Sequence, residues 1–230
     1  MLCAGIVGGV GPESTLDYYR NIVAGYRSRM AGDAYPRIII NSINMTEMLA
    51  FVYSRNFDGL TDFLLSAIDS LGRAGADFAA IASNTPHVVF DQVSARSPLP
   101  LISIVETTCT RAFSLRLKKV LLIGTGFTMK STFFQECFSW YGIEVIVPSA
   151  ENREIIQNII FPDLENGIVA PGKKQELLRL CNDTMAGKSV DGIVLGCTEL
   201  PLMVSKDDFA IEVLNTTQIH IDAIVGRLAG

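Results

Sequence analysis

The chain has 230 residues, of which 49% are hydrophobic and 19% are charged, with a formal net charge of −5 at pH 7. This length is enough for one large domain or two small ones with a buried core. The negative charge argues against a nucleic-acid partner, and no apolar run reaches the ~20 residues that a membrane span needs. With no targeting signal visible, we expect a cytoplasmic protein.

Apolar runs and helical patterns alternate along the whole chain. The apolar runs predict buried strands at residues 4–7, 37–42, 78–82, 101–104, 120–123, 144–147, 192–195 and 211–214. The helical patterns cover residues 14–30, 58–74, 86–93, 105–115, 130–141, 152–165, 173–185 and 217–228. Strands that are apolar throughout are typical of parallel sheets covered by helices on both faces. The sequence therefore predicts an α/β fold.

Two parts of the chain repeat one arrangement: a helix, a small-residue turn, a buried strand, and then a hydroxyl or thiol beside threonine. The first ends in Ser83-Asn84-Thr85 and the second in Gly196-Cys197-Thr198-Glu199. The duplication predicts two related α/β units, residues 1–98 with 215–230 and residues 99–214, facing one site in the cleft between them. The join is placed at residues 97–100 because two prolines there exclude a continuous helix.

The loop after the first strand, residues 8–15, is rich in glycine. Glycines allow close approach of a ligand, and amides at a helix N-terminus favour an anion, so Gly9 and Val10 are candidate substrate contacts. The spacing fits neither a dinucleotide-binding loop nor a P-loop. A plain strand-to-helix turn is the alternative.

Polar residues at two later strand ends are further candidates, because ligands of open α/β sheets bind beyond the carboxyl ends of strands. The amides of Asn84 and Thr85 are candidates for binding a carboxylate that the Ser83 hydroxyl faces, although helix capping explains a single such cluster equally well. Thr125 and Thr128 form a third cluster, which offers hydroxyls to an anion or is a simple turn.

Cys197 stands out among the five cysteines, which are odd in number and show no CxxC spacing. That pattern argues against a disulfide framework and against a metal site. Backbone amides at the strand end are expected to lower the pKa of the Cys197 thiol, whereas the alternative is an inert buried cysteine. Thr198 follows it, and Glu199 either orients a partner or caps a helix. His87 and His220 are candidates to assist the two strand ends, or are structural hydrogen-bonding residues.

Four motifs in this order resemble the cofactor-independent aspartate/glutamate racemases, a group that includes hydantoin racemases, maleate isomerases and arylmalonate decarboxylases. They are Gly8-Gly9-x-Gly11-Pro12-x-Ser14-Thr15, Asn84-Thr85-x-His87, Gly124-Thr125-x-x-Thr128 and Gly196-Cys197-Thr198-Glu199. The likeness runs essentially end to end. It implies a homodimer of pseudo-symmetric chains that uses neither pyridoxal phosphate nor metal, so no cofactor is expected.

The resemblance also implies a mechanism. Two cysteines of such enzymes stand on opposite faces of the substrate α-carbon, where one thiolate removes the α-proton and the other thiol reprotonates the carbon. Cys197 matches the second of these cysteines and is expected to act on the L-enantiomer. Amides near Asn84-Thr85 and Cys197-Thr198 would bind the α-carboxylate.

Ser83 departs from this pattern, because the two-thiol members carry cysteine there. It is a natural proton relay, an engineered replacement of cysteine, or the mark of a one-base decarboxylase or isomerase. The expected substrate is an acidic amino acid, aspartate or glutamate, with Arg55 pairing its distal carboxylate. A solvated loop position is the alternative for Arg55. A non-catalytic dicarboxylate-binding protein is the rival from another functional class.

Overall fold

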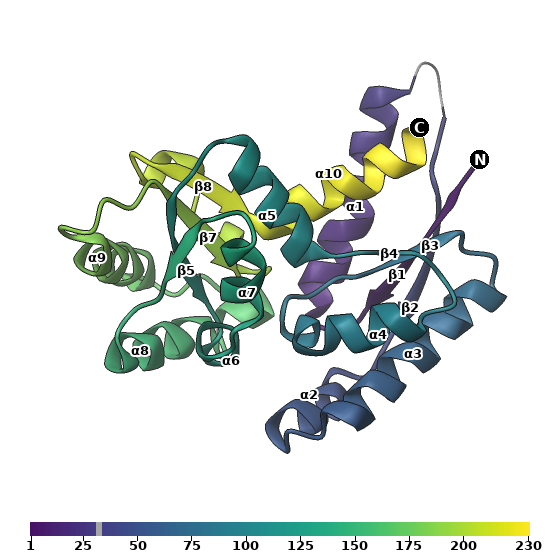
Figure 1. The fold of residues 1–230 in the computed structure, drawn as a ribbon, viewed down its shortest axis with the longest axis horizontal. Coiled ribbons are helices and arrows are strands. Elements are labelled where there is room, and N and C mark those ends of the chain that lie inside the picture. The colour runs from purple at the N-terminus through teal and green to yellow at the C-terminus, as the bar shows by residue number, and fades with distance from the viewer. Residues whose placement is uncertain (31–33) are drawn as a thin grey trace. The chain divides into compact units, whose positions relative to one another are not determined.

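The computed structural model describes residues 1–30 and 34–230. The chain divides into two compact units, Met1–Thr107 with Thr217–Gly230 (unit 1) and Thr108–Thr216 (unit 2) (Figure 1). The first boundary lies within α5 (Ile104–Ser114) and the second at the start of α10 (Thr216–Ala229). The first boundary lies after the two prolines because the next strand, β4 (Leu101–Ile102), pairs with β3 (Phe78–Ile81) in the sheet of unit 1.

Each unit contains one parallel four-stranded sheet. Unit 1 has the order β2-β1-β3-β4, with β1 at Cys3–Gly8 and β2 at Arg37–Ser42. Unit 2 has the order β6-β5-β7-β8. Its strands are β5 (Lys119–Gly124), β6 (Glu144–Ile146), β7 (Gly192–Gly196) and β8 (Glu212–Asn215). The predicted α/β fold is confirmed, with all eight strands present. Both sheets follow the same order relative to the chain, as the internal repeat leads one to expect.

The helices agree less closely with the sequence patterns. Besides α5 and α10 they are α1 (Pro12–Arg29), α2 (Met45–Tyr53), α3 (Phe57–Arg73), α4 (Phe90–Arg96), α6 (Gly126–Lys130), α7 (Phe133–Ser139), α8 (Ala150–Ile160) and α9 (Lys173–Met185). The predicted helix 130–141 is wrong, because Ser131 and Thr132 separate α6 from α7. The predicted helix 152–165 ends at Ile160, since Pro162 lacks the amide hydrogen a helix interior needs. Helix α2 was not predicted.

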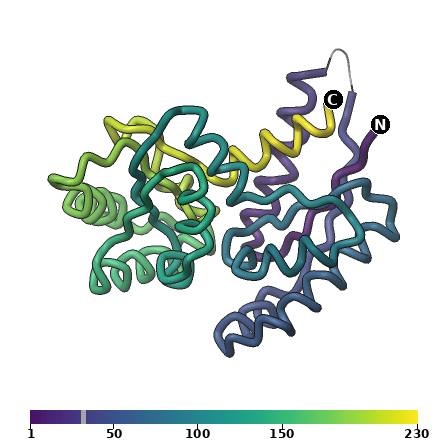
Figure 2. The backbone as a smooth tube through the Cα atoms, in the orientation of Figure 1, coloured from purple at the N-terminus to yellow at the C-terminus, as the bar shows by residue number. Residues whose placement is uncertain are grey.

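The core of unit 1 lies between one face of its sheet and the helices α1 and α10. Buried residues of α1 (Tyr18, Ile22) and α10 (Ile221, Ile224) pack with even-numbered strand residues such as Ile6. Figure 2 shows the yellow C-terminal helix beside the purple α1. On the other sheet face, a Cβ added to Gly5 would lie 3.0 Å from Ala76 and 3.2 Å from Leu71, so α3 packs closely there.

The core of unit 2 is built from odd-numbered strand residues and the helices α8 and α9. Leu121, Ile193 and Leu195 of the sheet pack with Ile156 of α8 and Leu177 of α9. Strands that bury side chains on both faces explain the continuous apolar runs of the sequence. Among the described residues, no helix combines the length and the apolar character needed to cross a membrane.

Candidate active site

Most of the predicted site residues lie at the carboxyl ends of the strands of the two sheets. In unit 1, Gly9 and Val10 follow β1, and Ser83 follows the neighbouring strand β3, whose end is held by Ala82 N donating to Val7 O at 2.9 Å. In this sheet β2 lies on one side of β1 and β3 lies on the other, so the strand order reverses at β1. Such a reversal of strand order is where open α/β sheets bind ligands. The structure therefore brings these two predicted clusters to one switch point.

Gly9 has a conformation that only glycine adopts readily. Its φ is +82°, and an added Cβ would lie 2.4 Å from the carbonyl oxygen of Ile43. Its amide donates to Oγ1 of Thr15 at 2.8 Å. This amide therefore stabilises the loop itself, and Val10 remains as the candidate substrate contact of the segment.

His87 is buried directly behind Ser83. Its Nδ1 lies 2.9 Å from the carbonyl oxygen of Ser83, and its Nε2 accepts from the Ile104 amide at 3.3 Å. Burial lowers the pKa of His87 to about 3, with a smaller contribution from His220. Ser83 and Asn84 are buried and Thr85 is half-buried, so the polar cluster of unit 1 is well shielded from water.

The switch point of unit 2 lies between β5 and β7. Gly124 and Gly196 are in register on these strands, so Thr125 and Cys197 leave the sheet side by side. An added Cβ on Gly196 would lie 3.0 Å from Ile123 O and 3.3 Å from Thr128 Cγ2. The side chain of Thr125 caps α6 through the Thr128 amide at 3.2 Å. The paired glycines thus let the Thr125 cluster approach the end of the strand that carries Cys197.

The decisive geometry of unit 2 is a three-residue hydrogen-bonded cluster. The Cys197 thiol donates to Oε2 of Glu199 at 3.0 Å, and the Thr198 hydroxyl donates to the same oxygen at 2.8 Å. Cys197 is 6% exposed and Glu199 is 5% exposed. A carboxylate oxygen in this position can accept the thiol proton, so the cluster has the arrangement of an acid–base pair.

The pKa of Cys197 is raised well above 9.0, not lowered as the sequence led us to expect. Burial is the largest cause, followed by the charge of Glu199 and its hydrogen bond with the thiol. A hydrogen bond from the Glu199 backbone lowers the pKa but is outweighed. The Cys197 sulfur is therefore a protonated thiol near neutral pH.

Glu165 is a candidate that the sequence analysis missed. It follows Leu164, which belongs to the same core cluster as Cys197. Burial and the nearby charge of Glu199 raise the pKa of Glu165 to about 7, and Glu165 in turn raises the pKa of Cys197. No spacing rule links a glutamate to a cysteine 32 positions later, so only the fold reveals this neighbour.

Arg55 and His220 are placed differently from the strand-end clusters. Arg55 is exposed, follows α2 and has a left-handed backbone with φ 55°. His220 is 0% exposed, and its ring nitrogens lie 2.7 Å from Tyr18 Oη and 2.9 Å from Ile102 O. These bonds connect α10 to α1 and β4 within unit 1, which favours the structural interpretation of His220.

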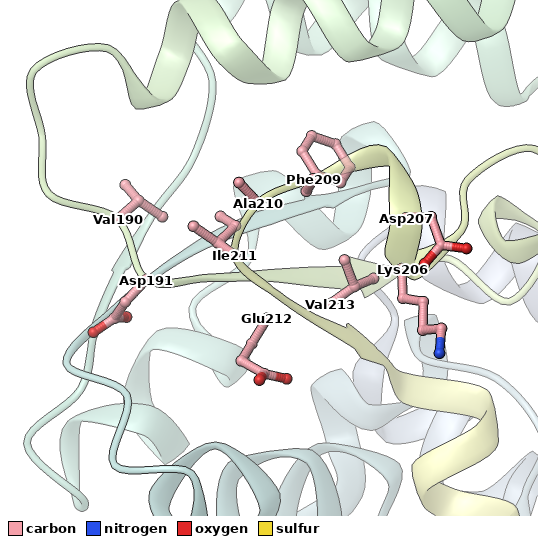
Figure 3. Close-up of a pocket in the computed structure, with 9 residues that line it drawn as sticks. All are labelled: Val190, Asp191, Lys206, Asp207, Phe209, Ala210, Ile211, Glu212 and Val213. Atoms are coloured by element: carbon pink, nitrogen blue, oxygen red, sulfur yellow. The ribbon is translucent and has the colours of Figure 1, made fainter.

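A surface hollow of about 700 Å³ lies elsewhere in unit 2 (Figure 3). Asp191, which precedes β7, and Glu212, the first residue of β8, help line it, so it lies at the amino ends of these strands. The Asp191 carboxylate accepts from the backbone amides of Lys118 and Lys119 at 2.9 and 3.0 Å. The hollow contains none of the predicted site residues. Across the described ranges, no three His, Cys, Asp or Glu side chains gather as a metal-binding group.

Comparison with known proteins decides the family. The model of the family described as Asp/Glu/Hydantoin racemase matches residues 7–224. The chain belongs to this family. Racemases are isomerases, and both strand-end clusters, Ser83-Asn84-Thr85 and Cys197-Thr198-Glu199, lie within the matched residues.

Individual relatives of the racemase family cover most or all of the chain. A structure from Yersinia pestis, described as a candidate Asp/Glu racemase, is 31% identical with a TM-score of 0.92 over 100% of both chains. An aspartate racemase homologue from Pyrococcus horikoshii OT3 is 35% identical with a TM-score of 0.87, again over 100% of both. The broad specificity amino-acid racemase RacX of Bacillus subtilis is 24% identical over 93% of this chain and 92% of its own length.

Proposed function

We propose that the protein is a cofactor-independent amino-acid racemase in which Cys197 is the thiol acid–base group. The observation that carries the proposal is the 3.0 Å hydrogen bond from the Cys197 thiol to Oε2 of Glu199, at the switch point of unit 2. A thiol with a raised pKa needs a base to become a nucleophile or proton acceptor, and Glu199 is in contact with it. Membership of the racemase family supports the reaction class.

The reaction begins with transfer of the Cys197 proton to Oε2 of Glu199. The thiolate then takes the α-proton of the L-substrate, which leaves a carbanion on the α-carbon and a thiol on Cys197. Backbone amides at the strand ends and the exclusion of water stabilise the developing charge. A proton delivered to the opposite face of the carbon, with Ser83 as the relay, gives the D-enantiomer. The serine hydroxyl gives up one proton and regains one from water, and the hydroxide that this leaves takes the proton held by Glu199, so that every group returns to its starting state.

The proposed substrates are the acidic amino acids aspartate and glutamate. Family membership supports this choice, and exposed Arg55 of unit 1 supplies a guanidinium for the distal carboxylate. One relative is named a broad specificity racemase, so the screen should also include neutral and basic amino acids.

The Ser83 position favours one second candidate, a one-base decarboxylase or isomerase. Such a reaction needs a single thiol and no group of comparable acidity on the opposite face. The two functions differ in their products. A racemase converts one enantiomer into the other, whereas a decarboxylase releases carbon dioxide and shortens the carbon chain.

Chiral chromatography of product tests the proposal. Incubation of L- or D-aspartate and of L- or D-glutamate with the protein should give the opposite enantiomer at equal total amino acid. Conversion of a neutral or basic amino acid, without conversion of aspartate or glutamate, would support the racemase activity and exclude the acidic amino acids as its substrates. Loss of total amino acid with carbon dioxide release would favour the decarboxylase. No conversion and no α-proton exchange, together with ligand-dependent thermal stabilisation, would favour a binding protein.

A further inference from the structure

His87 occupies an environment that fixes its protonation state. The side chain is 3% exposed and stacks on Phe90, with ring centroids 4.9 Å apart and an interplanar angle of 8°. Its Nδ1 lies 2.9 Å from Ser83 O, which accepts hydrogen bonds only, so Nδ1 carries the proton. Its Nε2 faces the Ile104 amide at 3.3 Å, which donates, so Nε2 is unprotonated.

The ring is therefore a neutral imidazole with both nitrogens occupied. Burial, the largest cause, lowers its pKa to about 3, so this state persists throughout the neutral range. A histidine held in this way has no nitrogen available to carry a proton to or from a substrate. His87 therefore does not act on the substrate as an acid or a base, and its contribution to the site has another physical basis.

That basis is the connection that the ring makes. The ring bonds to the carbonyl of Ser83, the residue that immediately follows Ala82. The last strand-like hydrogen bond at the end of β3 runs from Ala82 N to Val7 O, so Ser83 lies just beyond the sheet. The bond from the ring to Ile104 reaches the first residue of α5. The Ser83 backbone thus leaves the sheet and is anchored at once to a second element.

We propose that His87 is a positioning residue that, through the neutral ring, fixes the backbone carrying the Ser83 hydroxyl. The inference rests on the proposed function, because Ser83 has a role only in that reaction. If Ser83 serves the D-enantiomer and Cys197 the L-enantiomer, loosening Ser83 changes the two exchange rates unequally. A general loss of folded protein changes both equally. The ratio of α-proton exchange from D- and L-substrate is therefore the informative quantity.

The chain offers a matched control in His220. This histidine is also fully buried and also has both nitrogens occupied, but its bonds to Tyr18 and Ile102 do not involve Ser83. Asparagine is the conservative replacement for His87, because its side-chain amide can place an N–H near the position of Nδ1. Leucine removes both hydrogen bonds.

The experiment measures α-proton exchange in D₂O from both enantiomers of aspartate and of glutamate. For His87→Leu we expect the D/L exchange ratio to fall at least 10-fold, in the same sense as for Ser83→Ala. His87→Asn should restore the ratio to within about 3-fold of the wild type with an unchanged pH profile. His220→Leu should leave the ratio unchanged.

The outcomes separate the two claims. If Ser83→Ala changes the ratio and His87→Leu does not, the positioning role is overturned while the proposed function stands. If Ser83→Ala itself leaves the ratio unchanged, the role of Ser83 fails and the inference fails with it. Nitrogen-15 NMR of the wild-type protein tests the ring without any variant. A protonated Nδ1 and bare Nε2 from pH 8 to pH 5 support the proposal, and titration of His87 between pH 6 and pH 7 overturns it.

Discussion

Cys197 and Glu199 are joined by a hydrogen bond, in which the thiol donates to Oε2 of the carboxylate at 3.0 Å. The two residues are separated by Thr198 alone, whose hydroxyl donates to the same oxygen. Burial of the thiol is the largest cause of its raised pKa, and the charge of the buried Glu199 carboxylate raises it further. Glu199 therefore helps to keep the thiol protonated at rest and is also the base positioned to remove its proton.

Replacing Glu199 by glutamine should have two opposite effects. Loss of the charge lowers the pKa of Cys197, and loss of the carboxylate removes the base that accepts its proton. We expect α-proton exchange from the L-substrate at pH 7 to fall about 100-fold, the low end of what a general base contributes. Thr198→Val, which leaves the thiol–carboxylate contact in place, should reduce exchange far less. Equal rates for Glu199→Gln and the wild type would remove Glu199 from the mechanism.

Glu165→Gln should shift the pH profile of exchange to lower pH. Glu165 becomes charged as the pH rises through about 7, and its charge raises the pKa of Cys197. Without it, the rise in L-substrate exchange that follows thiolate formation should occur at lower pH. The control is Glu154→Gln, which makes the same change on an exposed residue of α8. A profile that moves as far for the control as for Glu165→Gln contradicts the assignment.

Acidification should destabilise unit 1 through its two histidines. Burial lowers the pKa of His87 to about 3 and that of His220 to about 4, whereas both are near 6.5 when unfolded. Below pH 6.5 the unfolded chain therefore binds more protons, so the free energy of unfolding falls as the pH falls, by about 1.4 kcal/mol per pH unit for each histidine. The free energy of unfolding can be measured by urea titration at several pH values between 6.5 and 4.5. Its change per pH unit should be smaller by that amount in His220→Gln than in the wild type. Parallel curves for variant and wild type would count against the assignment.

Arg55 allows binding and backbone strain to be separated. Its φ of 55° lies in the left-handed region, which costs a residue with a side chain about 1 kcal/mol. Arg55→Gly removes both the guanidinium and that cost, whereas Arg55→Ala removes the guanidinium alone. We expect both variants to raise KM for aspartate or glutamate, with Arg55→Gly more stable than Arg55→Ala by roughly 1 kcal/mol. An unchanged KM in both would place the substrate carboxylate elsewhere.

The strands and strand ends could be predicted from the sequence because they depend on local patterns. An apolar run followed by a small polar cluster, as at Leu195 to Thr198, marks both a buried strand and its exit. Helix α2 was missed because its nine residues follow β2 closely and show only two buried side chains, Met48 and Val52.

The electrostatics of the site could not be predicted from the sequence, because they depend on what surrounds each group. The amides expected to lower the pKa of Cys197 are opposed by burial and by two carboxylates, one of them from Glu165 far away in the chain. His87 and His220 look alike in sequence as solitary histidines. Only their hydrogen-bond partners distinguish an anchor behind Ser83 from one that connects α10 to α1.

The most direct test of the central claim is proton NMR in D₂O of L-aspartate and L-glutamate with three proteins: the wild type, Cys197→Ala and Cys137→Ala. Cys137 is 5% exposed on α7, so its variant makes the same deletion in a similarly buried position. Our account predicts that the α-proton signal is lost with the wild type and with Cys137→Ala, and persists with Cys197→Ala. Exchange that continues at the wild-type rate in Cys197→Ala would contradict it.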